Sequence, residues 1–167
     1  MAEPRILLIV PTLGQRIDYL AETLASIRSQ SVPADIVLVA PPHNPDLDRL
    51  VTEHRADFLP DPGSLTGAIN LGMSALKDSH DYVNWLNDDD LLEPGSLAAT
   101  QSALDGDPQA VVAFGACRYI DPEGQELWIS RAGPWAARVL KWGPDLIPQP
   151  GMLVRASAWK AVGGLDD

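Results

Sequence analysis

The sequence predicts an α/β domain built on an open, mostly parallel sheet with helices on both faces. Short, uninterrupted apolar runs recur along the chain, which is typical of strands buried on both faces of a parallel sheet. Between these runs, apolar residues recur every three or four positions, as on one face of an amphipathic helix. Regular alternation of strand and helix favours βαβ units. The 167 residues are enough for one domain with its own core and too few for two.

These two patterns place the elements in order. The first apolar run, at 6–10, is followed by a helical pattern over 16–29 and by a second run at 36–39. Further strands are predicted at 56–59, 82–86, 110–116 and 151–155, and further helices at 47–54, 65–76, 94–107 and 156–162. Gly67 and Gly72 lie inside the third helix, where each costs up to ~1 kcal/mol relative to alanine. They indicate either close approach by a ligand or another backbone, or packing of the helix on the sheet.

The charge balance excludes several classes of partner. The chain has 12 basic and 23 acidic residues and a net charge of −11. A nucleic-acid interface needs a basic footprint and anionic lipid needs a polybasic patch, so we expect neither partner. No stretch approaches the ~20 apolar residues that span a bilayer, and the N-terminus does not have the layout of a signal peptide.

The single cysteine bears on compartment and core. Cys117 is the only cysteine, so the chain forms no internal disulfide and suits a reducing compartment. We therefore expect a cytoplasmic protein. Because Cys117 ends the apolar run that starts at Ala110, we expect it to be a small core residue.

The most informative stretch runs from Tyr82 to Gly95. Its apolar run ends abruptly at three consecutive carboxylates, Asp88, Asp89 and Asp90. The carboxyl end of a buried strand is where open α/β sheets hold their ligands. Three adjacent negative charges repel one another, and a hard divalent cation that also binds phosphate oxygens makes them favourable. The alternative is a solvated acidic loop before the next helix, since Asp is common at helix N-caps.

Tryptophan is concentrated near the C-terminus. Four of the five tryptophans are Trp128, Trp135, Trp142 and Trp159. The spacing from Trp135 to Trp142 predicts a short helix. These side chains form either part of the core or a surface for a carbohydrate acceptor, because sugar rings lay their C–H faces on aromatic rings.

Four segments stand out in order along the chain: the first strand into Pro11-Thr12 with its helix, Ala68–Gly72 (Ala-x-Asn-x-Gly), the acidic stretch within Trp85–Gly95, and Gln149-Pro150 with Arg155 and Val162–Asp166. In this order they resemble the first motif, the Ala-x-Asn-x-Gly helix, the metal motif and the acceptor-side segment of the family 2 inverting glycosyltransferases, whose Rossmann-like glycosyltransferase-A fold binds nucleotide-diphospho-sugars. The resemblance runs nearly end to end. It implies one domain, with a nucleotide-sugar-binding half at about 1–125 and an acceptor-side segment at about 126–167.

The resemblance also implies an activity of the hexosyltransferase type. A sugar would pass with inversion from a nucleotide diphosphate donor to a carbohydrate, lipid-linked or small-molecule acceptor. Mn²⁺ or Mg²⁺ would stabilise the charge on the departing diphosphate. The implied metal ligands are Asp89, the direct one, and Asp90, and the implied donor-binding residues are Pro11, Thr12, Asn70, Asn87 and Asp88. The implied acceptor-side residues are Gln149, Trp142 and Arg155. A homodimer is compatible with this assignment.

The sequence departs from the family pattern at two places. The second strand ends in Val39-Ala40-Pro41-Pro42, where the family usually has acidic residues that bind the nucleoside. The family's catalytic base lies several positions beyond the Gly-Gly-Leu-Asp segment, and this sequence ends at Asp167. We therefore expect a shortened domain or a fragment of a longer enzyme, with Asp166 and Asp167 as weak candidates for the base.

Two other functions remain open at the level of sequence. The departures suggest a catalytically silent nucleotide-sugar-binding or scaffold module of the same fold. An acidic cluster at the end of a buried strand also suits a Mg²⁺-dependent nucleotidyl- or phosphotransferase on an open α/β sheet.

Overall fold

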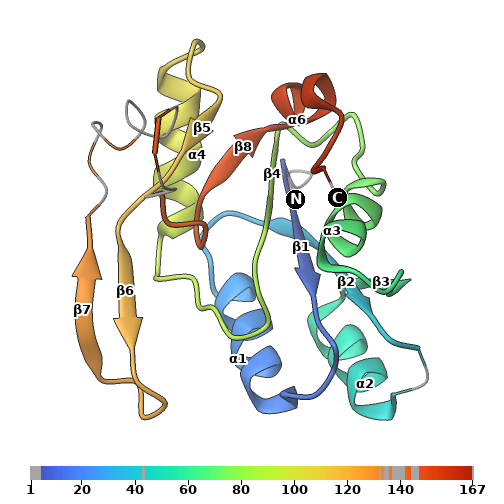
Figure 1. Cartoon of the computed structure of the whole chain (residues 1–167). Coiled ribbons are helices and arrows are strands. Elements are labelled where there is room, and N and C mark those ends of the chain that lie inside the picture. The colour runs from blue at the N-terminus through green and yellow to red at the C-terminus, as the bar shows by residue number, and fades with distance from the viewer. Residues whose placement is uncertain are drawn as a thin grey trace.

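The computed structural model describes residues 5–42, 44–131, 133, 136, 142–143 and 147–166. Within these ranges the chain forms a six-stranded sheet in the order β3-β2-β1-β4-β8-β5 and a separate two-stranded sheet of β6 and β7 (Figure 1). The strands are β1 (Ile6–Pro11), β2 (Ala34–Ala40), β3 (Asp57–Pro60), β4 (Tyr82–Trp85), β5 (Val112–Ala113), β6 (Cys117–Ile120), β7 (Glu126–Ser130) and β8 (Leu153–Arg155).

The main sheet is mostly parallel, as predicted. β1 pairs in parallel with β2 on one side and with β4 on the other, and β2 pairs in parallel with β3. β8 runs antiparallel to β4 and to β5. The strand predicted at 151–155 therefore exists, but it enters the sheet in the opposite direction.

Helices cover both faces of this sheet, which confirms the predicted fold class. They are α1 (Ile17–Arg28), α2 (Pro45–His54), α3 (Leu65–Met73), α4 (Ser96–Gly106) and α6 (Ala156–Val162). Successive residues of β1 point to opposite faces, as a strand requires. Ile6 and Leu8 pack into the core under α1, α2 and α4, whereas Leu7 and Ile9 pack into the core under α3 and α6. Among the helices of the described ranges, none has the length and apolar character needed to cross a bilayer.

Gly72 shows why a glycine interrupts α3. A Cβ atom added there would lie 2.4 Å from Cγ2 of Ile9 on β1, which is closer than atoms can approach. The glycine therefore lets the helix lie directly on the sheet, so packing accounts for it. At Gly67 a Cβ atom would lie 2.8 Å from Oγ of Ser64. Ser64 is the N-cap of α3, and its Oγ accepts a hydrogen bond from the Gly67 N–H at 3.1 Å.

The prediction for 110–117 was wrong in two respects. Only Val112 and Ala113 of this run are in a strand, and the residues of the run are half-buried or exposed. Their partner β8 is only three residues long, so the pairing is short. Cys117 opens β6 and is half-buried instead of lying in the core. The β6–β7 hairpin, with its turn at 121–125, was not predicted as a hairpin. The helix predicted from Trp135 to Trp142 lies largely outside the described residues.

The order of the strands creates a crevice at one edge of the sheet. From β1 the chain adds β2 and β3 on one side, and α3 then returns it to β4 on the other side of β1. At such a switch point the connections leave neighbouring strands in opposite directions and open a space beyond the carboxyl ends. Pro11 ends β1 at this edge and Thr12 follows it, and Asn87 to Asp90 come after β4.

Candidate functional site

A cavity of about 560 Å³ lies at this switch point. Its walls come from the end of β1, the loop into α1, the end of β2, the β3–α3 turn and the loop after β4. The lining residues are Pro11, Thr12, Leu13, Gln15, Arg16, Val39, Asp61, Gly63, Ser64, Leu65, Ala68, Asn87, Asp88 and Asp89. The cavity therefore combines apolar walls with a charged rim, as small-molecule sites do.

Backbone hydrogen bonds that extend the strand ladders hold the surrounding loops in place. The Thr12 N–H donates to the Val39 carbonyl at 3.0 Å. The Asp61 N–H donates to the Ala40 carbonyl at 2.9 Å, and the Leu86 N–H donates to the Ile9 carbonyl at 2.8 Å. Each loop is thus anchored to the rigid sheet immediately before the residues that line the cavity.

Asp88 is the fixed member of the acidic cluster. It is only 8% exposed, and both of its carboxylate oxygens accept hydrogen bonds. Thr12 Oγ1 donates to Oδ2 at 2.5 Å, and Arg16 Nη2 donates to Oδ1 at 2.6 Å. A carboxylate buried to this extent needs such partners, because an unpaired buried charge is costly.

Arg16 joins two members of the cluster. Its Nη1 donates to Asp89 Oδ2 at 2.6 Å while Nη2 donates to Asp88. The hydrogen bond to Asp89, together with the charges of Asp88 and Asp89, raises the pKa of Arg16. The sequence argument assigned the neutralisation of these carboxylates to a metal, whereas the structure supplies a cation from the chain itself.

Asp90 faces a different cavity. It lines a second space of about 610 Å³ together with residues of α1 and β6, whereas Asp89 lines both cavities. Asn87 Nδ2 donates a hydrogen bond to Asp90 Oδ2 at 2.9 Å. Burial raises the pKa of Asp90; the Asn87 bond lowers it, and the charges of Asp89 and Asp88 raise it further. The three carboxylates do not converge on one point. Within the described ranges, no three His, Cys, Asp or Glu side chains are grouped to hold a metal ion.

Four of the predicted donor-binding residues, Pro11, Thr12, Asn87 and Asp88, line the first cavity, and Asn70 does not. Asn70 Nδ2 donates to the Leu165 carbonyl at 2.9 Å, and the Leu165 N–H donates to Asn70 Oδ1 at 3.0 Å. Its observed contact is therefore with the segment after α6.

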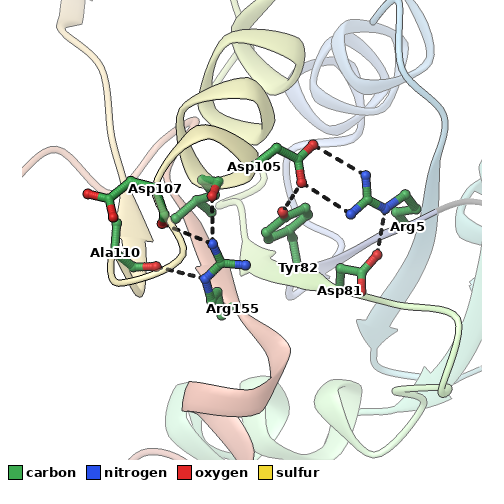
Figure 2. Close-up of polar contacts among 8 residues, drawn as sticks. Arg5, Asp81, Tyr82, Asp105, Asp107, Ala110 and Arg155 are labelled. Carbon is green, nitrogen blue, oxygen red and sulfur yellow. Dashed lines mark hydrogen bonds and ion pairs between the residues drawn. The ribbon is translucent and has the colours of Figure 1, made fainter.

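The predicted acceptor-side residues lie in different places. Gln149 Nε2 donates to Asn84 Oδ1 at 3.3 Å and also contacts the Trp85 carbonyl, so it is tied to the end of β4 nearest the acidic loop. Arg155 lies at the other end of β4, opposite Tyr82. It donates to the carbonyls of Ala110 and Leu104 at 2.7 and 2.6 Å (Figure 2). Trp142 is 83% exposed.

The candidate bases follow the segment that Asn70 holds. Asp166 is exposed and comes directly after Leu165. Asp167 lies outside the described residues.

Sequence reasoning missed four polar residues of the first cavity, namely Gln15, Arg16, Asp61 and Ser64. Arg16 follows a loop and looked like an ordinary helix start. Asp61 belongs to an Asp-Pro-Gly-Ser turn. All four residue types are common in turns, so this composition indicated a turn and no further role for Asp61. The available signal was positional, because Asp61 follows β3 at the same sheet edge where the expected acids after β2 are missing.

The family model described as glycosyl transferase family 2 matches residues 7–156, from the second residue of β1 through β8. The chain belongs to glycosyl transferase family 2. No curated protein matches it in a sequence comparison.

Solved structures of glycosyltransferases share the fold of this family 2 domain. It matches S. aureus TarS 1–349 with a TM-score of 0.68 and 16% identity, over 95% of this chain and 49% of that one. It matches a mannosyltransferase, PcManGT from Pyrobaculum calidifontis in complex with GDP-Man and Mn²⁺, with a TM-score of 0.67 and 16% identity, over 99% of this chain and 48% of that one. The chain thus spans about half the length of these proteins.

The same fold occurs in a solved structure of a different enzyme. The 4-diphosphocytidyl-2C-methyl-D-erythritol synthase of Anaerococcus prevotii matches with a TM-score of 0.62 and 13% identity, over 95% of this chain and 73% of that one.

Proposed function

We propose that this chain binds the donor of a metal-dependent glycosyltransferase, which moves a sugar from a nucleotide diphosphate to an acceptor hydroxyl with inversion. The observation that carries the proposal is the cavity at the switch point, with Asp88 and Asp89 on its rim. Family membership supports glycosyl transfer, and the two glycosyltransferase neighbours include complexes with GDP-Man and Mn²⁺ and with UDP.

The nucleoside would lie against the apolar wall formed by Pro11, Val39, Leu65 and Ala68. Asp61 would bind the nucleoside in place of the acidic residues that the family usually has after its second strand. Its Oδ1 accepts a hydrogen bond from the Gly63 N–H at 3.0 Å, and its Oδ2 has no hydrogen-bond partner within the described ranges. A carboxylate with one oxygen outside any hydrogen bond is a good acceptor for ribose hydroxyls or for the N–H groups of a base.

The chemistry of the donor set fits a hard cation. Mg²⁺ and similar ions are usually held by one or two carboxylates together with substrate phosphates, so three converging carboxylates are not required. The Asp89 side chain is 43% exposed and lines the cavity, and it would be the direct ligand. Asp88 and Asp90 would act by orienting the donor or the waters around the ion. A bound Mn²⁺ or Mg²⁺ would stabilise the negative charge on the departing diphosphate.

On the acceptor side, inversion needs a base within hydrogen-bond reach of the attacking hydroxyl. Asp166 is a candidate, because the two hydrogen bonds between Asn70 and Leu165 fix the residue before it. Gln149 is bonded to the end of β4 next to the acidic loop and would help to shape the acceptor side, with Trp142 as an exposed ring for a sugar. The contacts of Arg155 are with α4 and the loop after it, so its part would be structural.

Two observations favour competing functions. The ion pairs of Arg16 with Asp88 and Asp89 suit a module that binds nucleotides without metal or chemistry. The likeness to a diphosphocytidyl-methylerythritol synthase suits a nucleotidyltransferase.

The nature of the bond that is broken separates these functions. Incubation with UDP-, GDP- and dTDP-sugars and Mn²⁺, with water or a simple glycoside as acceptor, should release the nucleoside diphosphate. The C1–O bond of the sugar breaks, and the acceptor oxygen takes its place. A nucleotidyltransferase would instead break the bond between the two phosphates and release a nucleoside monophosphate and a sugar 1-phosphate, and a silent module would release nothing while still binding nucleotide.

A further inference from the structure

We propose that Arg16 is the resident counter-ion of the proposed metal site, and that binding of metal and diphosphate transfers Asp89 from Arg16 to the metal. Arg16 then keeps Asp88 and turns its freed nitrogen to the diphosphate. This inference rests on the proposed function for the identity of the ligand. It goes beyond that function because it assigns a switching role to a residue outside the acidic motif.

The two halves of the Arg16 fork differ in their surroundings. Nη2 bonds Asp88, whose side chain is 11% exposed and is also fixed by Thr12. Nη1 bonds Asp89, whose side chain is 43% exposed. Within the described ranges, Asp89 has no other hydrogen-bonding or ion-pair partner. Exposed ion pairs contribute little to stability, so the pair with Asp89 is the one that gives way easily.

Charge makes the exchange necessary. Two carboxylates and one guanidinium leave a net charge of −1 at the cavity rim, and a divalent ion brought to Asp89 would meet the positive Arg16 at close range. Like charges that share one ligand repel each other in a partly buried site. Movement of Nη1 away from Asp89 removes this conflict, and the Arg16 side chain, 48% exposed, has room to move.

The freed nitrogen has an obvious new partner. Arg16 is the only Lys or Arg among the described residues that line the first cavity. A guanidinium is well suited to phosphate oxygens, because its planar donors form charge-assisted hydrogen bonds. Arg16 would therefore hold Asp88 with one nitrogen and the diphosphate with the other.

The exchange predicts opposite effects of one substitution on two ligands. In Arg16→Gln, Mn²⁺ alone, followed by the electron paramagnetic resonance signal of the free ion, should bind roughly tenfold more tightly, because the competing cation is gone. At saturating Mn²⁺, the affinity of Arg16→Gln for nucleoside diphosphate should be lower by a factor of roughly ten or more, because a charge-assisted hydrogen bond is lost.

Two matched variants control this experiment. Arg49→Gln changes the net charge equally on the outer surface of α2, where Arg49 pairs with Glu53 at 3.0 Å, and should change neither affinity. Arg16→Lys keeps the charge but cannot bridge Asp88 and Asp89 with two nitrogens, so its affinity for Mn²⁺ should lie between those of wild type and Arg16→Gln.

The outcomes separate this inference from the proposed function. If wild type binds nucleotide only with metal and Arg16→Gln binds Mn²⁺ no more tightly than Arg49→Gln, the inference is overturned and the function stands. If wild type binds no Mn²⁺ and Arg16→Gln gains Mn²⁺ binding, Arg16 excludes the ion instead of yielding Asp89 to it, and both the exchange and a metal-dependent wild-type function are overturned. If neither protein binds Mn²⁺, both are overturned.

Discussion

The side chain of Asn70 forms two hydrogen bonds with the backbone of Leu165, at 2.9 and 3.0 Å, which join residues 95 positions apart. The contact is tight, since a Cβ atom on Gly164 would lie 2.7 Å from Asn70 Oδ1. Gly164 also has a φ of +102°, a conformation that glycine adopts without strain. Asn70 and Gly164 therefore fix together how the chain leaves α6.

Replacement of Asn70 by Ala should release this segment. The partly buried N–H and carbonyl of Leu165 would lose their partners, at a cost of about 1–3 kcal/mol in the free energy of unfolding. Hydrogen exchange should show lost protection at the Leu165 amide, and denaturant titration should give the cost. Thr66→Ala on the same helix is the control. An Asn70→Ala protein that matches it in both measurements would show that the two hydrogen bonds with Leu165 contribute nothing to stability.

Replacement of Gly72 by Ala should destabilise the protein by about 1–3 kcal/mol, because the added methyl group overlaps Ile9. Ile9→Ala alone should cost about 2–5 kcal/mol by leaving a cavity. In the double variant the new methyl group occupies part of that space. Its cost should be smaller than the sum of the two by about 0.5 kcal/mol or more. Strict additivity in urea titrations would argue against direct contact of α3 with β1.

Asp105 should make stability depend on pH. Tyr82 donates to its carboxylate at 2.5 Å and Arg5 donates at 3.2 Å (Figure 2). The Tyr82 hydrogen bond, followed by that of Arg5, lowers the pKa of Asp105. A carboxyl group whose pKa is lower in the folded state stabilises the fold above its unfolded pKa, about 3.9, and loses this effect as the pH falls through the folded value.

The stability difference between wild type and Asp105→Asn should therefore be largest near neutral pH and shrink below pH ~3.9. Thermal unfolding over a pH series measures it. A stability difference between wild type and Asp105→Asn that is independent of pH would contradict the assignment.

Asp61→Asn should weaken nucleotide binding if Asp61 serves the nucleoside. Loss of one charge-assisted hydrogen bond corresponds to a roughly tenfold higher Kd, and the effect should be the same with and without Mn²⁺ because the residue does not touch the metal. Asp57→Asn, on β3 just before Asp61 but outside the cavity, is the control in calorimetric titrations. Equal affinities for the two variants would remove Asp61 from the site.

The sequence predicted the first two thirds of the fold well because those elements are set locally. The uninterrupted apolar run at 6–10 is the pattern of a buried strand, and the apolar residues every three or four positions in α1 are the pattern of a helix. Both patterns lie within the segment itself, and the structure forms β1 and α1 there. The run at 110–116 failed because apolar composition does not show whether a partner strand is available. Its partner β8 lies about 40 residues further along and pairs with only two residues of the run.

The candidate site divides in the same way. Asp88 and Asp89 were visible because three adjacent acids after a strand are unusual. Arg16 was not visible, because it meets Asp88 across 72 positions of sequence, and only the parallel pairing of β1 with β4 brings them together. The loop after β4 then separates Asp90 from Asp88, because Asp88 lines the first cavity and Asp90 lines the second.

The most direct test of the account is calorimetric titration of the protein with UDP, GDP and dTDP, with and without Mn²⁺, for wild type and Asp89→Ala. The exposed Glu53→Ala is a control for the lost carboxylate. The account predicts that Mn²⁺ tightens the binding of at least one nucleotide to wild type and to Glu53→Ala. It also predicts that Asp89→Ala keeps its thermal stability and loses this metal effect. Equal nucleotide affinity with and without Mn²⁺ in wild type, or an Mn²⁺-dependent increase in affinity that persists in Asp89→Ala, would contradict the account.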